Sequence, residues 1–197
     1  MKSKGLIITI AVIAVIIVAA IWGVSVYNGL VNSEEDVNKQ WANVESQYQR
    51  RADLIPNLVA TVKGYATHEK ETLENVVNAR AKATQVKVDA ENLTPEKMQE
   101  YQAAQGELGS ALGKLLMVVE NYPELKANQN FLELQAQLEG TENRIQVERM
   151  RYNEVAGEFN KAIRIFPKSL IASLTGFNRK PYFESDEAAK DAPKVEF

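Results

Sequence analysis

The chain begins with an almost unbroken apolar stretch and then changes to polar sequence with regularly spaced hydrophobic positions. Residues Leu6–Val26 are Ile, Val, Leu and Ala, interrupted only by Thr9, Trp22, Gly23 and Ser25. A helix needs about 20 apolar residues to cross the hydrocarbon core of a bilayer, and this run contains no charged residue. The pattern therefore predicts a membrane-spanning helix over residues 6–26.

A cleaved signal peptide is the alternative interpretation of this run. Signal peptides have an apolar region of about 7–15 residues that ends in small side chains. Val18-Ala19-Ala20 resembles such an end, but apolar residues continue past it to Val26. Trp22 and Tyr27 lie near the far end, where aromatic side chains favour the headgroup layer. We therefore favour a retained anchor.

The distribution of basic residues predicts the orientation of this anchor. Lys2 and Lys4 precede the run, whereas only Lys39 lies between the run and Arg50. Under the positive-inside rule the N-terminus is cytoplasmic and the large domain lies outside the cytoplasm. The absence of cysteine excludes a lipid-modified N-terminal Cys and is compatible with either compartment.

Beyond the run, apolar residues recur at intervals of three and four, which is the spacing of one helical face. Ser33 followed by Asp36 predicts one helix start, and Thr94-Pro95-Glu96 predicts another. Pro56 lies inside the first pattern, where it removes a backbone hydrogen bond to Ala52 and predicts a bend. The predicted helices cover residues 33–64, 69–88, 95–122 and 131–166, the last with a coiled-coil-like period of 3.5.

Short connections make neighbouring helices antiparallel, so these elements predict an all-α, up-down-up-down four-helix bundle with long first and fourth helices. The fourth helix then returns toward the membrane. The expected organisation is a short cytoplasmic N-terminus (1–5), a transmembrane anchor (6–26), the bundle with a C-terminal amphipathic cap (27–183) and a disordered tail (184–197). The tail ends in Val195-Glu196-Phe197, which could serve as a carboxylate-capture ligand.

Two groups of polar residues fall in the middle of the long first and fourth helices. If these helices pack against each other, the groups come level and form a polar layer. Such a layer would set helix register or, alternatively, form an interaction patch on the bundle wall. Its candidate residues are Arg50, Arg51, Asp53, Asn57, Glu142, Arg144, Glu148 and Arg149, with Asn143 beside them.

The segment 166–180 follows the returning fourth helix and reads as a short amphipathic helix closed by Gly176. It predicts a second membrane contact at the headgroup layer, or else an apolar plug that closes the open end of the bundle. The residues concerned are Lys168, Leu170, Ile171, Leu174, Phe177, Arg179 and Lys180.

Small residues recur on the third helix at Ala103, Gly106, Ser110 and Gly113. Glycine costs about 1 kcal/mol in a helix interior, so a compensating close helix contact is expected. The contact lies either within the bundle, which we favour, or with a second copy of the chain.

Composition gives little support for catalysis or nucleic-acid binding. The net charge is −3 with both signs mixed, so there is no basic footprint for nucleic acid. Carboxylate-bridged metal sites in bundles need Glu-x-x-His pairs, and the chain has one histidine, His68. The segment 109–115 only imitates a phosphate-binding loop, because its spacing is one residue short. We expect no enzyme activity, cofactor or metal.

A set of short motifs follows in order through residues 27–184. They are Tyr27-Asn28-Gly29-Leu30-Val31, Arg50-Arg51-Ala52-Asp53-Leu54-Ile55-Pro56-Asn57-Leu58-Val59, Val62-Lys63-Gly64-Tyr65, His68-Glu69, Tyr122-Pro123-Glu124-Leu125-Lys126, Leu138-Glu139-Gly140-Thr141-Glu142-Asn143-Arg144-Ile145, Tyr152-Asn153, Phe166-Pro167, Gly176-Phe177 and Tyr182-Phe183. In these motifs the sequence resembles the LemA family of bacterial membrane proteins. The resemblance implies one N-terminal membrane helix followed by a long antiparallel helical bundle, and it implies no defined enzyme activity or cofactor.

Together these observations predict a membrane-anchored, non-enzymatic helical interaction or scaffold protein. We expect a single-pass protein of the bacterial plasma (inner) membrane, with its large domain on the extracytoplasmic side. Its partners would be other proteins or copies of itself. The alternative is a protein that organises lipid or membrane through the segment 166–180.

Overall fold

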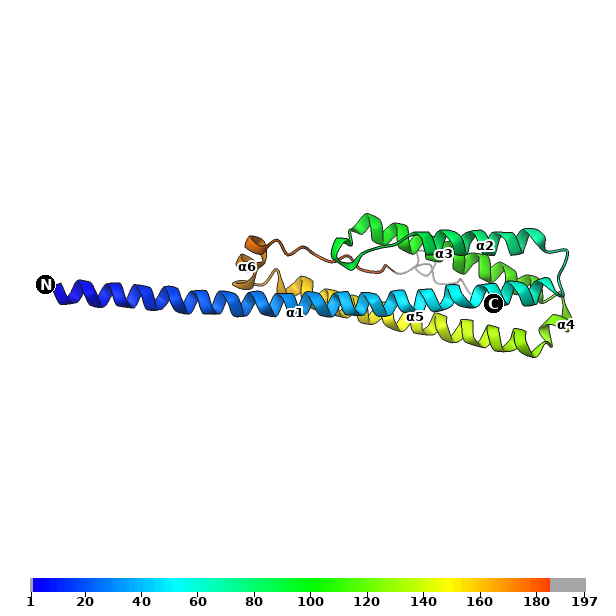
Figure 1. Cartoon of the computed structure of the whole chain (residues 1–197), viewed down its shortest axis with the longest axis horizontal. Coiled ribbons are helices and arrows are strands. Elements are labelled where there is room, and N and C mark those ends of the chain that lie inside the picture. Colours follow the sequence, from blue (N-terminus) through cyan, green and yellow to red (C-terminus); the bar gives the residue numbers. More distant parts are fainter. Residues whose placement is uncertain (1, 185–197) are drawn as a thin grey trace, which may run out of the picture.

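The computed structural model describes residues 2–184, and every regular element in this range is a helix (Figure 1). The all-α class is therefore confirmed. The elements are α1 (Lys2–Lys63), α2 (Lys70–Gln85), η1 (Ala90–Asn92, a 3-10 turn), α3 (Pro95–Val119), α4 (Pro123–Lys126), α5 (Gln129–Ala162) and α6 (Lys168–Thr175).

The predicted anchor and the predicted first bundle helix form one continuous helix, α1. The helix start predicted at Ser33 is therefore wrong. The Ser33 hydroxyl donates a hydrogen bond to the Gly29 carbonyl at 3.0 Å, inside the helix, instead of capping a new one. Because an α-helix rises about 1.5 Å per residue, α1 is roughly 90 Å long. The apolar segment is thus rigidly joined to the polar part of the molecule.

The four long helices pack as two pairs, α1 with α5 and α2 with α3 (Figure 1). The long α5 lies against α1, while α2 packs against α3 and also contacts α1. This arrangement places the ends of α5 at the two ends of the polar part of α1. The regular four-helix bundle with up-down-up-down order remains a prediction, as do the domain boundaries.

The helix start predicted at Thr94-Pro95 is confirmed, whereas the fourth helix starts at Gln129, two residues before the predicted Phe131. Thr94 caps α3, since its side chain accepts a hydrogen bond from the Lys97 amide, and Pro95 is the first helical residue. Asn128 caps α5 in the same way through the Phe131 amide at 3.0 Å. The predicted C-terminal end of the fourth helix is wrong, because α5 ends at Ala162.

The buried apolar residues form two clusters along the molecule. The proximal core lies nearer the apolar segment of α1 and is rich in aromatic rings, whereas the distal core is almost wholly aliphatic. The proximal core includes Leu30, Val37, Trp41, Val44, Tyr48, Tyr101, Ile145, Tyr152, Phe159, Ile163 and Phe183. The distal core includes Ile55, Leu58, Val62, Leu73, Val76, Leu108, Leu112, Leu115, Leu125 and Phe131.

Pro56 lies inside α1 without interrupting it. Proline has no N–H, so the carbonyl of Ala52, four residues earlier, loses its usual helical partner. Arg80 of α2 replaces that partner, since its Nε donates to the Ala52 oxygen at 2.7 Å. The defect in α1 thus becomes a specific contact between α1 and α2.

Candidate functional site

A polar layer separates the two cores and is centred on Arg51 of α1, which is 4% exposed. Arg51 Nη1 donates to Glu142 Oε2 of α5 at 2.8 Å, and Nη2 donates to Gln105 Oε1 of α3 at 2.8 Å. The amide of Gln105 in turn donates to the Ala83 carbonyl of α2 at 3.3 Å. One buried guanidinium and its neighbour therefore connect all four long helices. Sequence reasoning missed Gln105 because it occupies an apolar position of the helical pattern.

The other residues predicted for this layer lie elsewhere. Arg50, Asp53, Asn57 and Arg144 are exposed, and Asp53 accepts a hydrogen bond from Gln49 at 2.7 Å. They lie outside the layer because successive helical residues turn by about 100°. Arg51 and Glu142 are thus the predicted residues that contact each other directly.

Glu148 belongs to a separate contact closer to the apolar end of α1. It accepts a hydrogen bond from Gln40 of α1 at 2.6 Å and pairs with Arg151 at 2.8 Å. This contact adds a second polar link between α1 and α5.

A polar cleft of about 300 Å³ lies between α3 and α5, beside the Arg51 layer. Arg149 lies at this cleft and donates to the backbone oxygen of Glu184 at 2.8 Å, with its guanidinium over the Phe183 ring at 4.9 Å. Arg51 also lines the cleft, and its Nε is buried without a hydrogen-bond partner. The cleft thus contains hydrogen-bond donors as well as the carboxylate of Glu142.

The small residues of α3 do not make the close internal contact that we favoured. Ala103, Gly106, Ser110 and Gly113 are exposed, and a Cβ atom built on Gly106 or Gly113 would meet nothing within 4 Å. The exposed side of α3 therefore has space for further atoms.

Residues 177–184 have no regular secondary structure and form a segment, the C-terminal strap, that runs back along α5 (Figure 1). Asn160 forms a reciprocal pair with Lys180: the side-chain amide donates to the Lys180 oxygen and its own oxygen accepts from the Lys180 amide, both at 2.8 Å. Asn153 makes the same pair with Phe183, again at 2.8 Å. Seven helical residues span about 10.5 Å and three extended residues about 10 Å, so the two pairs are in register.

Two asparagines of α5 are a sequence signal for this strap. Asn153 and Asn160 share one helix face at a spacing of seven, and polar side chains on an otherwise apolar face need partners. The predicted tail beyond Glu184, including Val195-Glu196-Phe197, lies outside the described residues.

The strap ends in the aromatic part of the proximal core. The Phe183 ring stacks on Trp41 with centroids 5.7 Å apart and meets Tyr152 edge-on at 5.3 Å. Burial raises the pKa of the Tyr48, Tyr101 and Tyr152 phenols. These hydroxyls therefore stay protonated at ordinary pH and act as hydrogen-bonding groups.

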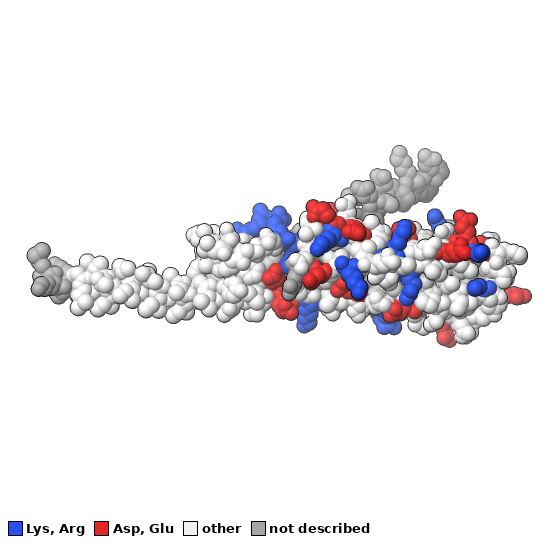
Figure 2. All heavy atoms as spheres, turned by 45° about the horizontal axis from the view of Figure 1, so that its top comes forward, with Lys and Arg blue, Asp and Glu red and all other residues white. Residues whose placement is uncertain are grey.

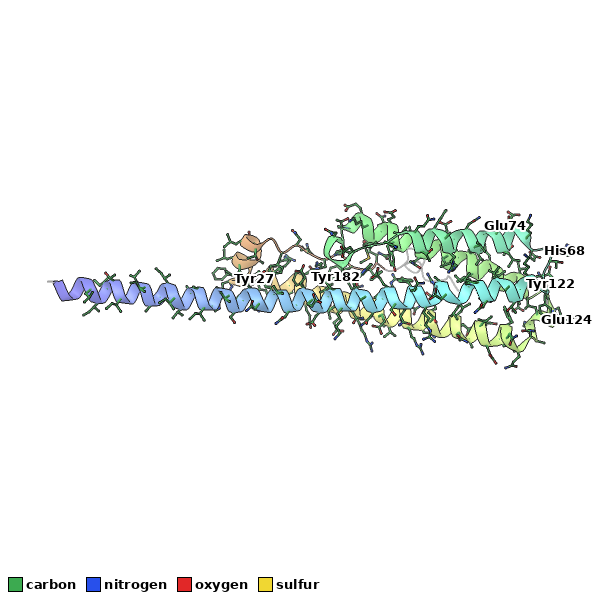
Figure 3. The ribbon with its side chains drawn as sticks, viewed as in Figure 1. Tyr27, His68, Glu74, Tyr122, Glu124 and Tyr182 are labelled. Carbon is green, nitrogen blue, oxygen red and sulfur yellow. The ribbon has the colours of Figure 1, made fainter. Side chains whose placement is uncertain are left out.

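α6 lies beside α1 where the apolar run of α1 ends, as Figure 3 shows near Tyr27. The rings of Tyr27 and Phe177 are 5.9 Å apart, and a Cβ built on Gly23 would lie 3.8 Å from Ile171 Cδ1. Ile171 and Phe177 are thus half-buried against α1.

The opposite side of α6 is apolar and exposed. Leu170 is 56% exposed, Leu174 is 83% exposed, and Phe166, just before the helix, is 75% exposed. The segment thus has one apolar side packed on α1, as in the predicted plug, and another apolar side free for the predicted membrane contact.

The basic residues of this segment divide in the same way. Lys168 and Arg179 are exposed. Lys180 is 7% exposed, and its Nζ pairs with Glu34 of α1 at 2.8 Å. Lys180 was predicted to contact the membrane, but its side chain is buried and its ion pair with Glu34 joins the strap to α1.

Within residues 2–184, no group of three or more His, Cys, Asp or Glu side chains could hold a metal ion. His68 lies at the distal end of the molecule with Tyr122 and Glu124 (Figure 3). In the same range, α1 is the one helix long and apolar enough to cross a membrane.

Comparison with known proteins tests the family resemblance. The LemA family model matches residues 40–197, which is most of the chain. The protein belongs to the LemA family. Relatives include magnetosome protein MamQ 2 of Paramagnetospirillum magneticum, which is 28% identical over 186 residues, covering 86% of this chain and 68% of the relative. Protein LemA of Metamycoplasma hominis is 24% identical over 160 residues, covering 81% and 69% respectively.

A third relative is magnetosome protein MamQ of Magnetospirillum gryphiswaldense, 27% identical over 186 residues, with 86% of this chain and 68% of the relative covered. None of these names describes a reaction.

The motifs that carry the LemA resemblance build the contacts described above. The motif around Arg51 and Pro56 supplies the buried guanidinium and the Ala52 carbonyl that accepts from Arg80. Tyr152-Asn153 and Tyr182-Phe183 meet each other, since Asn153 pairs with the Phe183 backbone and the Tyr152 hydroxyl donates to Pro181 at 3.1 Å. In this LemA protein, motifs far apart in the chain thus meet around α5.

Proposed function

We propose that this protein is a non-enzymatic helical module that stands on a bacterial plasma membrane, with α1 as its anchor and α6 as a second contact with the same membrane surface. The observation that carries the proposal is the packing of α6 against Gly23 and Tyr27, where the apolar run of α1 ends. The position of α6 is therefore linked to the depth of the anchor.

The exposure of the α6 side chains supports this contact. Phe166, Leu170 and Leu174 present large apolar surfaces to the solvent side. Burial of apolar surface stabilises by about 25 cal/mol per Å², so these side chains gain by entering the boundary between headgroups and acyl chains. Lys168, on the same helix, is exposed and can reach lipid phosphates.

Spin labelling tests this second contact in the full chain reconstituted in liposomes. The chain contains no cysteine, so Leu174→Cys introduces a single label site. Met117→Cys, at an exposed position on the distal half of α3, is the matched control. We expect the Leu174 label to be accessible to oxygen and shielded from a water-soluble nickel chelate, with the opposite result at Met117. Equal, water-like accessibility at both sites would overturn the membrane contact.

The role that we propose for the part beyond the membrane is binding of protein partners or of other copies. The observation that favours it is the exposed small-residue side of α3 beside the polar cleft, where Gly106 and Gly113 have open space. Small side chains allow another helix to approach closely. With the predicted orientation, this surface faces the extracytoplasmic side.

Substitution of Gly106 tests this surface. Gly106→Leu adds a bulky side chain without an internal clash, and Gly140→Leu on α5 adds the same group where a built Cβ also meets nothing within 4 Å. If copies associate through α3, Gly106→Leu lowers the cross-linked dimer fraction in membranes, whereas Gly140→Leu leaves it unchanged. Equal dimer fractions in both variants would exclude this face for self-association.

A further inference from the structure

A second cavity, of about 420 Å³, lies at the end of α5 next to α6. Gly157, Asn160, Lys161 and Arg164 line it from α5 and the turn that follows, and Arg179 and Tyr182 line it from the strap. Gly157 adds no side chain to this wall, and a Cβ built there would lie in van der Waals contact with the Tyr182 hydroxyl, at 3.8 Å.

The basic residues around this cavity have uncompensated charge. Three basic residues at the cavity are exposed: Lys161, Arg164 and Arg179. Within residues 2–184, none of them forms an ion pair with an acidic side chain. The neighbouring Lys180 differs, because Glu34 neutralises it. Figure 2 shows Lys and Arg gathered at the end of the charged part nearest the apolar helix. The cavity therefore attracts an anion.

The depth of the cavity relative to α1 indicates which anion it meets. Lys180 pairs through its backbone with Asn160 of α5 and through its Nζ with Glu34 of α1, so Asn160 is roughly level with Glu34. Arg164 follows Asn160 by four residues, about one helical turn closer to the apolar segment, which is near the level of Leu30. Leu30 is one helical turn beyond Val26, or roughly 6 Å farther along the axis. The headgroup layer on each side of a bilayer is about 5–7 Å thick. An anchor spanning residues 6–26 thus brings these cations to the level of the lipid phosphates.

An apolar surface adjoins the basic one. Ile165, which also lines the cavity, is 47% exposed, and Phe166 beside it is 75% exposed. A soluble anion would contact the guanidinium groups alone, whereas a phospholipid would contact both the basic surface and the apolar surface. Basic pockets between transmembrane helices bind anionic headgroups, and here the cations adjoin an exposed apolar surface.

We propose that this cavity binds the headgroup of an anionic phospholipid, with its phosphate between Arg164 and Arg179 and its acyl chains over Ile165 and Phe166. The Tyr182 hydroxyl supplies a further hydrogen-bond donor. This inference rests on the proposed function, because it requires the end of the molecule that carries α6 to lie at the membrane surface.

Native mass spectrometry of the full chain in detergent tests the site, with phosphatidylglycerol, phosphatidylcholine and inorganic phosphate as the three probes. We expect phosphatidylglycerol to bind in preference to phosphatidylcholine, and Arg164→Gln/Arg179→Gln to weaken it about tenfold or more. Arg50→Gln/Arg144→Gln makes the same change of charge at exposed positions away from the cavity and should leave binding unchanged. Gly157→Leu, which fills the cavity without altering charge, should weaken binding as the arginine variant does.

Equal binding in the two charge variants, or equal binding of the two lipids, would overturn the proposal. Displacement of phosphatidylglycerol by millimolar inorganic phosphate would overturn it in favour of a soluble-anion site. The Leu174 spin label separates this inference from the proposed function. A buried label without lipid preference refutes the headgroup site alone, whereas preferential lipid binding with a water-exposed label refutes the second membrane contact alone.

Discussion

The two halves of the polar part of this molecule are stabilised in different ways. The distal core is an aliphatic seam, formed by elements that follow one another closely in the chain. The proximal core brings together Trp41, Tyr101, Tyr152 and Phe183, which come from α1, α3, α5 and the strap. The Arg51 layer lies between them. A regular apolar period is thus sufficient for one half, whereas the other half depends on contacts between distant segments.

The difference has a functional consequence. The strap connects α6 to the proximal core through Asn153, Asn160 and Lys180. The part of the molecule nearest the proposed membrane contact is therefore the part that relies most on specific polar pairs. Changes near the membrane should reach the proximal core more readily than the distal core.

Trp41→Ala should have the largest effect on stability. Trp41 is 1% exposed and contacts the rings of Tyr101, Tyr152 and Phe183. Removal of a buried aromatic side chain costs about 3–5 kcal/mol. Chemical unfolding in detergent measures the loss, and hydrogen exchange locates it. We expect faster exchange in the strap and the end of α5, with little change in α2. A uniform increase over both halves would show that they unfold as one unit.

Arg51→Ala tests the layer between the halves and should cost about 3 kcal/mol, because it leaves the buried Gln105 Oε1 without its donor. Glu142→Gln should cost less than about 1 kcal/mol, since that side chain is 48% exposed and screened by solvent. Urea unfolding measures both. Arg50→Ala is the exposed control and should stay within about 0.5 kcal/mol of the original chain. Equal losses for Arg51→Ala and Arg50→Ala would refute the role of the layer.

Asn160→Ala should release the strap at a cost of about 1–3 kcal/mol, because both hydrogen bonds to the buried Lys180 backbone are lost. Asn153→Ala should have a smaller effect, because Asn153 is less buried. Limited trypsin digestion reports the release as faster cleavage of the Arg179–Lys180 bond. Asn143→Ala, at an exposed site on α5, is the control. Unchanged cleavage in the Asn160 variant would mean that the strap is held by its aromatic contact alone.

A double-mutant cycle tests the link between Pro56 and Arg80 in the distal half. Arg80→Ala should cost about 1–2 kcal/mol, because it leaves the Ala52 carbonyl without a donor. In the Pro56→Ala background a helical N–H is restored, so the same substitution should cost about 1 kcal/mol less. Thermal unfolding of the four proteins measures the coupling. Additive effects would show that the Arg80 contact does not compensate for proline.

The smallest expected effect concerns Glu45 in the proximal half. Burial raises the pKa of this carboxyl above its ordinary value of 4.5. The folded state therefore disfavours the charged form, and the resulting cost is present at neutral pH and fades as the pH falls toward 4.5. Glu45→Gln should increase the free energy of unfolding at pH 7 by less than about 0.5 kcal/mol after solvent screening. Ser46→Ala, a neighbouring substitution without a titrating group, should show no such pH dependence. If the stabilisation by Glu45→Gln grew as the pH fell, the pKa of Glu45 would not be raised in the folded state.

Several elements were predictable because their causes are local. The uncharged run before Tyr27, the Thr94-Pro95 helix start and the apolar stripes of α3 and α5 follow from residue type and spacing. The ends of α1 were harder to predict. Ser33 has the chemistry of a cap, but the preceding residues also favour helix, so its hydroxyl bonds within α1.

The candidate site was less predictable, because its geometry depends on which side chains become level when helices pack. The pattern placed Arg51 and Glu142 in the middle of two helices, but it gave no reason to separate Arg51 from Arg50. The pattern also gave no partner for Lys180. Its partner in the structure is Glu34, which is far away in the chain.

By itself, the sequence determined that this is a helical LemA protein with one long apolar segment followed by helices that each carry an apolar stripe. These properties depend on helical periodicity and on the cost of exposing apolar surface, which act over a few residues at a time. Only the tertiary structure decided that α6 lies beside Gly23 and Tyr27, that Asn160 holds the strap and that Arg80 replaces the N–H missing at Pro56. In each case a side chain meets a segment distant in the chain, and the register of packed helices selects that partner.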